Sequence, residues 1–362
     1  MKKIWLDSYP EHVPSELSNL KFNSIQGIFR YASKKFSKSV AFNNLGTNLS
    51  FKKTALLADK FSAYLTNVLK LKKGDKVALM LPNLLTFPIS FFGSLNIGTI
   101  VININPLFKS REVKSLLADC GAETIVILDK FLDELEPILN ETKIKNVIVC
   151  RPFDLVSFPM SIIIRTILLF KNRANKISDD YILFNDVIRT REKPPNVLIS
   201  GNDIALLQYT GGTTGKSKAA VLTHHNLVSN IAQLQLWVKN TLSEGREIII
   251  TALPMYHIFS LTVNLLFFYR IGSKNVLITN PRDLKSFVKT LSQNKFTVIT
   301  AVNTLFNLLL TSAKFKNIKL QSLKFSVGGG MAVLKSTAKK WRSVTGCEIT
   351  QGYGLTETSP IV

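Results

Sequence analysis

Short apolar runs alternate with helix-like stretches along most of the chain. Lys76–Leu81 reads as a buried strand, and the stretch that follows it, Thr86–Asn96, reads as a helix. This alternation is typical of parallel sheets that carry helices on both faces, because parallel strands need long crossover connections. We therefore predict an α/β fold. Further elements expected before residue 151 are a helix from Ser50, strands at Thr99–Ile104, Thr124–Leu128 and Asn146–Cys150, a helix at Ser110–Asp119 capped by Ser110, and a helical stretch at Phe131–Asn140.

The alternation is interrupted between residues 151 and 202. This region holds an apolar segment, the polar stretch Lys171–Asp180 and the pair Pro194-Pro195. We interpret it as a connection between two α/β units, residues 1–195 and residues 196–362. The strands expected in the second unit are Ile204–Tyr209, Ile248–Leu253, Val276–Thr279, Val298–Val302 and Leu323–Val327.

The composition excludes several classes of protein. The 362 residues are 46% hydrophobic and 19% charged, which is enough apolar sequence for a large core and argues against disorder. The net charge of +22 comes from lysines spread along the whole chain, with no dense basic block and no nucleic-acid-binding motif, so we expect no nucleic-acid partner. Three widely separated cysteines indicate neither a disulfide framework nor a zinc site. No apolar core of a signal peptide follows the first residues, so we expect a cytoplasmic setting.

One apolar stretch, Val156–Phe170, allows two interpretations. It contains Pro159 and Arg165 and falls short of the ~20 residues that a spanning helix needs. Cations follow it at Lys171, Arg173 and Lys176, so it is compatible with peripheral association at the inner face of the cell membrane. An ordinary buried helix or connecting segment explains the stretch at least as well.

A polar loop, YTGGTTGKSK at Tyr209–Lys218, carries the strongest functional signal. Glycines allow the backbone to approach an anion closely, and free N–H groups, hydroxyls and ammonium groups bind phosphate oxygens. We expect a phosphate-bearing ligand, a nucleotide above all. The Walker A motif needs four residues between its first glycine and Gly-Lys-Ser/Thr, whereas Gly211 and Gly215 are separated by three. An extended segment, moreover, is expected after Lys218, with the next helix beginning only near Thr223–Asn226. These observations argue against a P-loop NTPase.

Four motifs occur in a fixed order: the loop at Tyr209–Lys218, PMYHIF at Pro254–Phe259, GGG at Gly328–Gly330 and QGYGLTE at Gln351–Glu357. In this order they resemble the adenylate-forming enzymes, specifically the AMP-forming acyl-CoA synthetases and most closely the bacterial long-chain-fatty-acid–CoA ligases. The resemblance extends to MKKIWLDSYPEHVP at the N-terminus, to LKKGDKVALMLPNLL and to ITNPRDL, and so covers essentially the whole chain. It implies two doubly covered, mostly parallel sheets packed together.

The resemblance also implies a reaction and a set of site residues. In this family ATP and a fatty acid give an acyl-adenylate and diphosphate, and coenzyme A then displaces AMP. His257 and Lys218 match catalytic positions, and Thr213 and Glu357 match the ligands of Mg2+, a cation that prefers oxygen donors. Tyr353 matches the aromatic residue that lies against adenine. The nucleotide-binding positions implied in total are Thr210, Gly211, Gly212, Thr213, Thr214, Gly215, Lys218, Gly328, Gly329, Gly330, Gln351, Gly352, Tyr353, Gly354 and Thr356.

The chain departs from the family pattern at two places. Ala219 stands where the family usually has glycine. The methyl group of alanine is harmless if φ is negative at this position and strains the backbone if φ is positive. The sequence also stops at Val362, before the family's ribose-binding Thr-Gly-Asp, its hinge and its small C-terminal domain with the adenylation lysine. We expect severely reduced activity unless these are supplied by another chain or a homodimer partner. Three interpretations remain: the large part of a ligase, a remnant that binds nucleotide or fatty acid without turnover, or an unrelated NTPase or membrane-surface protein.

Overall fold

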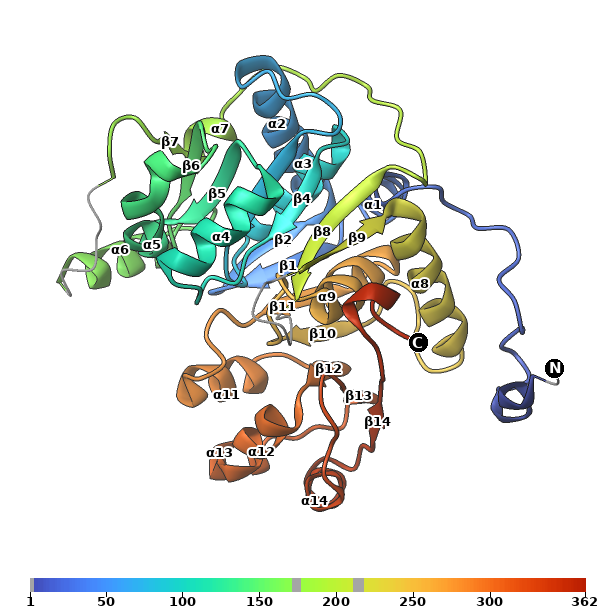
Figure 1. Ribbon diagram of the computed structural model, residues 1–362. Coiled ribbons are helices and arrows are strands. Elements are labelled where there is room, and N and C mark those ends of the chain that lie inside the picture. Colours follow the sequence, from blue (N-terminus) through green and yellow to red (C-terminus); the bar gives the residue numbers. More distant parts are fainter. Residues whose placement is uncertain (1–2, 171–176, 211–217) are drawn as a thin grey trace.

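Two seven-stranded sheets form the framework of the molecule, and each is parallel except for one antiparallel pair at an edge (Figure 1). The computed structural model describes residues 3–170, 177–210 and 218–362. Sheet 1 has the order β7 (Ile182–Leu183), β6 (Asn146–Cys150), β5 (Thr124–Leu128), β3 (Lys76–Met80), β4 (Ile100–Asn103), β8 (Ile204–Thr210) and β9 (Lys218–Thr223). Sheet 2 has the order β14 (Ile349–Gln351), β13 (Phe325–Gly328), β12 (Val298–Ala301), β10 (Ile248–Thr251), β11 (Lys274–Leu277), β1 (Val40–Asn44) and β2 (Thr47–Ser50).

Helices cover both faces of each sheet, as the fold prediction requires. The longer helices are α1 (Ile25–Lys35), α2 (Phe51–Ala63), α3 (Thr86–Asn96), α4 (Ser110–Cys120), α6 (Met160–Phe170), α8 (His224–Trp237), α11 (Leu284–Ser292), α12 (Asn303–Thr311) and α14 (Lys335–Thr345). The shorter helical segments are η1 (Ile4–Ser8), η2 (Tyr64–Val68), η3 (Asp129–Phe131), α5 (Leu132–Leu135), η4 (Glu136–Glu141), α7 (Phe184–Val187), α9 (Ile258–Ser260), η5 (Leu261–Phe267), α10 (Phe268–Arg270), α13 (Ala313–Lys316) and η6 (Thr356–Thr358).

The buried strands send alternate side chains into different cores. In β3, Val77 and Leu79 belong to the central core between the sheets, while Ala78 and Met80 belong to the core beneath α4 and α5. This is the period of two expected of a strand, and apolar residues on both sides mark a sheet that is buried on both faces. Sheet 2 follows the same rule, because Ile249 of β10 joins the central core and Ile250 joins the core beneath α11 to α14.

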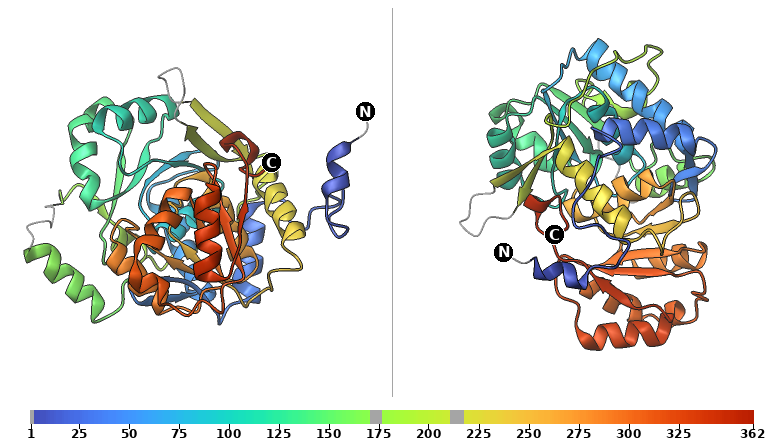
Figure 2. Two further views of the ribbon diagram at one scale, coloured as in Figure 1. Left: turned by 90° about the horizontal axis from the view of Figure 1, so that it is seen from below. Right: turned by 90° about the vertical axis from the view of Figure 1, so that its right-hand side faces the viewer.

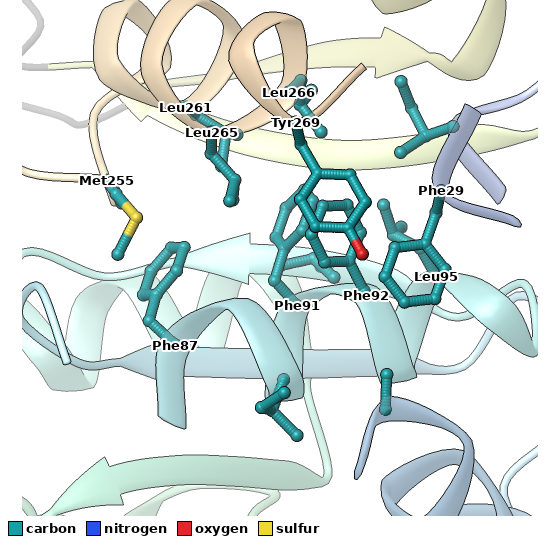
Figure 3. Packing of buried hydrophobic residues seen from close by; sticks show 14 of the residues in the cluster. Phe29, Phe87, Phe91, Phe92, Leu95, Met255, Leu261, Leu265, Leu266 and Tyr269 are labelled. Atoms are coloured by element: carbon teal, nitrogen blue, oxygen red, sulfur yellow. The ribbon is translucent and has the colours of Figure 1, made fainter. Parts of the chain in front are cut away.

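The central core joins the two sheets into one body. Phe87, Phe91 and Phe92 of α3 face the π-helical segment η5 and Tyr269 of α10 across this core (Figure 3). Leu261 to Phe267 are at most 4% exposed, so this apolar run packs in the core. Tyr269 is fully buried, and its hydroxyl hydrogen-bonds that of Ser33 at 2.8 Å.

The strands exchange between the two halves of the chain. The hairpin β1–β2 pairs with β11 and so belongs to sheet 2, whereas β8 pairs with β4 and belongs with β9 to sheet 1. The expected boundary at 195/196 is therefore not a boundary between sheets. As a division into folding units it stays a prediction.

Several local expectations are corrected. Ser110 is not the cap of its helix but the first helical residue, and its N–H and hydroxyl donate to Glu134 at 2.8 and 3.0 Å. The capping position is Lys109, whose N–H donates to the Glu112 carboxylate at 2.9 Å. The interruption at 151–202 is not only a connection, because β7 pairs with β6 at the edge of sheet 1. The stretch Phe131–Asn140 forms one α-helical turn followed by a 3-10 helix.

Candidate active site

The two ends of the polar loop meet at the tip of a β-hairpin. Strands β8 and β9 pair antiparallel, with Tyr209 opposite Ala219 and Thr210 opposite Lys218. The extended segment after Lys218 is thus confirmed, and so is the next helix, α8, whose cap Thr223 accepts from the N–H of Asn226 at 3.2 Å. Ala219 is not among the described residues with positive φ, so its methyl group causes no backbone strain.

Tyr209 anchors the start of this loop to helix α4. Its hydroxyl donates a hydrogen bond to the carboxylate of Asp119, near the end of that helix. Burial of the ring, with the neighbouring Asp119 as a second cause, raises the pKa of the phenol above its usual value. The hydroxyl therefore remains a donor at every physiological pH.

His257 lies on the segment that follows the carboxyl end of β10. Its Nδ1 accepts a hydrogen bond from the N–H of Phe259 at 3.3 Å, which assigns the proton of the neutral ring to Nε2. Part of the ring faces solvent, yet the surrounding protein displaces enough water to lower the pKa of the imidazole. The neutral form, with Nε2–H as its donor, is thereby favoured.

Two carboxamides, Asn83 after β3 and Gln208 in β8, hold the histidine segment. The side-chain nitrogen of Asn83 donates to the carbonyls of Thr251 and Leu253, both at 3.0 Å, and its oxygen accepts from the N–H of Met255 at 2.9 Å. Gln208 of β8 donates to the carbonyl of Tyr256 at 2.9 Å. The segment that carries His257 leaves sheet 2 after β10 and is therefore held against residues of the other half of the framework, Gln208 in β8 and Asn83 after β3.

The glycine turn at Gly328–Gly330 packs directly on its neighbours. A Cβ on Gly328 would lie 2.5 Å from a methyl carbon of Val333, and a Cβ on Gly329 would lie 3.0 Å from the ring of Phe259. Gly330 has a φ of +75°, which favours glycine. The N–H of Gly352 donates to the carbonyl of Gly328 at 2.8 Å, so the turn also contacts the motif that follows β14.

The last motif forms a tight reversal of the chain. Gly354 bridges to Ile361, and the N–H of Val362 donates to the carbonyl of Tyr353 at 3.1 Å. A Cβ on Gly354 would lie only 1.9 Å from the carbonyl oxygen of Pro360, so this position requires glycine. The side chain of Tyr353 is presented to solvent at 71% exposure. The amide of Asn230 on α8 fixes the end of the reversal through both backbone groups of Ile361.

These segments converge at the carboxyl ends of the parallel strands, where ligands bind in open α/β sheets. The tip Thr356–Thr358 (η6) contacts β9, and Figure 1 shows the C-terminal segment beside β9 and α8. The structure thus brings together Thr210, Lys218, His257, the glycine turn and the motif from Gln351 to Glu357. Gly211, Gly212, Thr213, Thr214 and Gly215 lie outside the described residues, and their roles stay predictions. Thr356 is half-buried, and Gln351, whose Oε1 accepts from the N–H of Val333 at 3.0 Å, and Glu357 are exposed.

Metal ligands are sparse in the described ranges. No group of three or more His, Cys, Asp or Glu side chains gathers there as a metal site. Glu357 contributes a single exposed carboxylate, which fits a cation bound chiefly by phosphate oxygens and water, as Mg2+ commonly is.

Asn83, Gln208 and Asn230 hold segments of the candidate site, and the motifs do not reveal them. Each carries a carboxamide that is buried, at 4%, 5% and 3% exposure respectively. Their sequence signal is a polar amide within an apolar run, as in LPNLL and ALLQYT. A buried amide must find hydrogen-bond partners, so this signal indicates a structural link without saying which segment is bound.

Comparisons with known proteins agree with this arrangement. Residues 29–362 match the family described as AMP-binding enzyme. The chain is 43% identical over its full length to a long-chain-fatty-acid–CoA ligase of Yersinia pestis, and 42% identical to one of Escherichia coli. It spans 65% of the length of each of these relatives. A solved long-chain-fatty-acid–CoA ligase from Archaeoglobus fulgidus has the same fold, with a TM-score of 0.81 at 21% identity over 98% of this chain and 68% of the other.

Proposed function

Because the chain belongs to the family of AMP-binding enzymes, we propose that it takes part in the activation of long-chain fatty acids. The reaction joins a fatty acid to ATP as an acyl-adenylate with release of diphosphate, and coenzyme A then displaces AMP. A carboxylate is a poor electrophile with a poor leaving group, and adenylation supplies the leaving group. The observation that carries the proposal is the convergence of the four motifs at one edge of the strands.

The proposal assigns a role to each part of this edge. Thr210 to Gly215 and Lys218 bind the phosphates, and the glycine turn with Gln351 to Thr356 binds the nucleoside, with adenine against Tyr353. Thr213 and Glu357 hold Mg2+, which neutralises phosphate charge. The Nε2–H of His257 donates to an oxygen of the acyl carboxylate or the α-phosphate. Such fixed donors stabilise the charge that develops in the transition state.

The proposal extends to partners that the overall reaction requires. Because the chain spans 65% of these relatives, we propose that the remaining functions reside in a further segment, on another chain or in a homodimer. Long-chain fatty acids partition into bilayers, so we also propose peripheral association with the inner face of the cell membrane. In the described part of the chain, every helix is too short or too polar to cross a bilayer.

Calorimetric titration with Mg-ATP tests the nucleotide site. We expect binding by the unaltered chain and weaker binding by Thr213→Ala and Tyr353→Ala. Thr311→Ala, an exposed threonine on α12, serves as the matched control and is expected to bind normally. Equal binding by all four proteins, or binding by none, contradicts the proposed site. With a fatty acid and coenzyme A present, formation of ADP and phosphate instead of AMP and diphosphate would contradict the proposed reaction.

A further inference from the structure

Helix α6 carries an apolar stripe that no described part of the chain covers. Met160, Ile163, Ile167 and Phe170 follow the spacing of one helical face, and they are 38%, 45%, 47% and 86% exposed. Figures 1 and 2 show this helix standing away from the body beside the β7 edge of sheet 1. The expectation of an ordinary buried helix is therefore wrong. A run of large exposed apolar side chains indicates an interaction surface.

A cleft with a cationic rim adjoins the base of this helix. Ser161 of α6 lines it, together with apolar side chains that include Leu57 and Val156. Lys53 and Lys60 of α2 stand at its rim, as does Arg189. Arg189 pairs with Asp186, at 3.1 Å between Nη1 and Oδ1, whereas neither lysine has a salt bridge to any described residue. The rim therefore keeps net positive charge at the base of α6.

The length and charge of this surface indicate what covers it. The eleven residues of α6 extend about 17 Å, which is too short for the ~30 Å hydrocarbon core of a bilayer. A helix of this kind lies in the plane of the membrane interface, with its apolar face among the acyl chains. The lysines of the rim, Arg165 on the helix itself and the net charge of +22 are complementary to anionic headgroups.

We propose that α6 and the adjoining cleft dock the protein on an anionic lipid surface. The stripe Met160, Ile163, Ile167 and Phe170 enters the interface, and Lys53 and Lys60 contact the headgroups. This inference rests on the peripheral association in the proposed function and locates it. It requires no nucleotide, because the surface is formed by α2, α6 and the segment after α7, all separate from the hairpin β8–β9.

Co-sedimentation with lipid vesicles tests the docking surface. We expect the unaltered chain to bind vesicles of mixed phosphatidylcholine and phosphatidylglycerol much more strongly than vesicles of phosphatidylcholine alone. The double variant Ile163→Ser/Ile167→Ser should bind the mixed vesicles at least about tenfold more weakly, because two inserted side chains are lost. Lys53→Gln/Lys60→Gln should reduce the preference for the anionic vesicles.

A matched control removes two exposed leucines elsewhere. Leu198→Ser/Leu334→Ser alters side chains that are 90% and 57% exposed and lie outside α6, and it should bind vesicles as the unaltered chain does. Circular dichroism of each variant checks the fold, and Mg-ATP titration of each variant separates the two proposals. A variant that loses vesicle binding but binds Mg-ATP normally affects the docking surface and leaves the nucleotide site intact.

Three results would overturn this assignment. The first is an unaltered chain that binds neither kind of vesicle, or binds both equally. The second is normal vesicle binding by Ile163→Ser/Ile167→Ser. The third is a lipid-free dimer that this variant dissociates, measured by analytical ultracentrifugation, which would assign the stripe to a second copy of the chain.

Discussion

The side-chain oxygen of Asn83 accepts a hydrogen bond from the N–H of Met255, and so links the carboxyl ends of the two sheets. The same amide donates to two carbonyls at the end of β10, and Thr279 donates to the Asn83 carbonyl at 3.0 Å. All these partners belong to sheet 2 or to the segments that leave it, while Asn83 follows β3 of sheet 1. One buried carboxamide thus fixes the segment that carries His257.

Replacement of Asn83 by alanine should destabilise the fold measurably. The N–H of Met255 would lose its partner in a buried place, which costs about 1–3 kcal/mol. The carbonyls of Thr251 and Leu253 each keep a second donor, the N–H of Ile278 and the hydroxyl of Ser260. We expect the free energy of unfolding to fall by about 2 kcal/mol in urea denaturation. Asn48→Ala removes an exposed asparagine of β2 and should change it by less than about 0.5 kcal/mol. Equal small effects in the two variants would contradict the linking role.

The two glycines that flank Tyr353 should respond differently to alanine. At Gly354 the added methyl group would overlap the carbonyl of Pro360 at 1.9 Å, whereas at Gly352 it would meet the Gly328 oxygen at 4.0 Å, an ordinary contact. Overpacking of this kind costs about 1–3 kcal/mol or more. We expect Gly354→Ala to lower the thermal midpoint and weaken Mg-ATP binding, and Gly352→Ala to preserve the midpoint. Equal midpoints for the two variants would show that the reversal around Tyr353 is absent in solution.

The bond between Tyr209 and Asp119 should couple helix α4 to the nucleotide loop. Tyr209→Phe removes the donor and keeps the ring, and Asp119→Ala removes the acceptor. A hydrogen bond to a carboxylate contributes about 1.5–3 kcal/mol when buried, so we expect about 1 kcal/mol at this partly exposed site. A double-mutant cycle that combines the two changes measures this coupling energy, once from urea unfolding and once from Mg-ATP affinity. Strictly additive effects of the two changes would mean that the bond contributes nothing.

Stability should decrease as the pH rises through the titration of Asp154. Burial raises the pKa of this carboxyl from 3.8 to about 6, against the opposing hydrogen bond from the N–H of Arg151. The folded state therefore binds the proton more tightly than the unfolded state. The stabilisation that the raised pKa provides is fully present below about pH 4. It is lost as the pH rises towards the pKa of Asp154 in the folded state. A pKa change of one unit corresponds to about 1.4 kcal/mol. The free energy of unfolding therefore falls by about 3 kcal/mol in total over this pH range.

The variant Asp154→Asn isolates this effect from other titrating groups. Urea denaturation between about pH 4 and pH 6.5, which covers the window between the unfolded-state and folded-state pKa values, should show a smaller decline for the variant than for the unaltered chain. Asn185, which donates to Asp154 at 2.8 Å, remains in both proteins. Parallel pH profiles for the two proteins would show that Asp154 has an ordinary pKa.

The sequence predicts those elements whose own residues determine them. The limits of α3, β5 and β6 agree with the expected ranges, because each is a compact apolar run between polar breaks. The strand expected at Val276–Thr279 begins two residues earlier, at Lys274, because its pairing with β10 and β1 determines its limits. Strands β1, β2 and β14 were not expected. Val40–Asn44 ends in two asparagines, and Ile349–Gln351 is too short for a periodic signal.

The candidate site likewise contains residues that the sequence predicts and contacts that it does not. Motif order predicts the residues that gather around the hairpin, because each motif carries its own local geometry. The motifs do not reveal the bonds from Asn83, Gln208 and Asn230, since each joins segments that are distant in the chain. Gly354 is a mixed case. The motif places a glycine at this position, but the neighbour that requires it, the carbonyl of Pro360, is visible only in the structure.

The exchange of strands between the sheets has a consequence for synthesis on the ribosome. Asn44 of β1 bonds the carbonyl of Leu277, 233 positions later, so the first hairpin emerges long before its partner strand. Strand β4 likewise pairs with β8, which is synthesised about a hundred residues later. A nascent or proteolysed fragment that ends in the connection after α7 would expose an unpaired edge at both β1 and β4, and such edges recruit other chains. The order of translation therefore leaves two edges of the first half unpaired until β8 and β11 have been made.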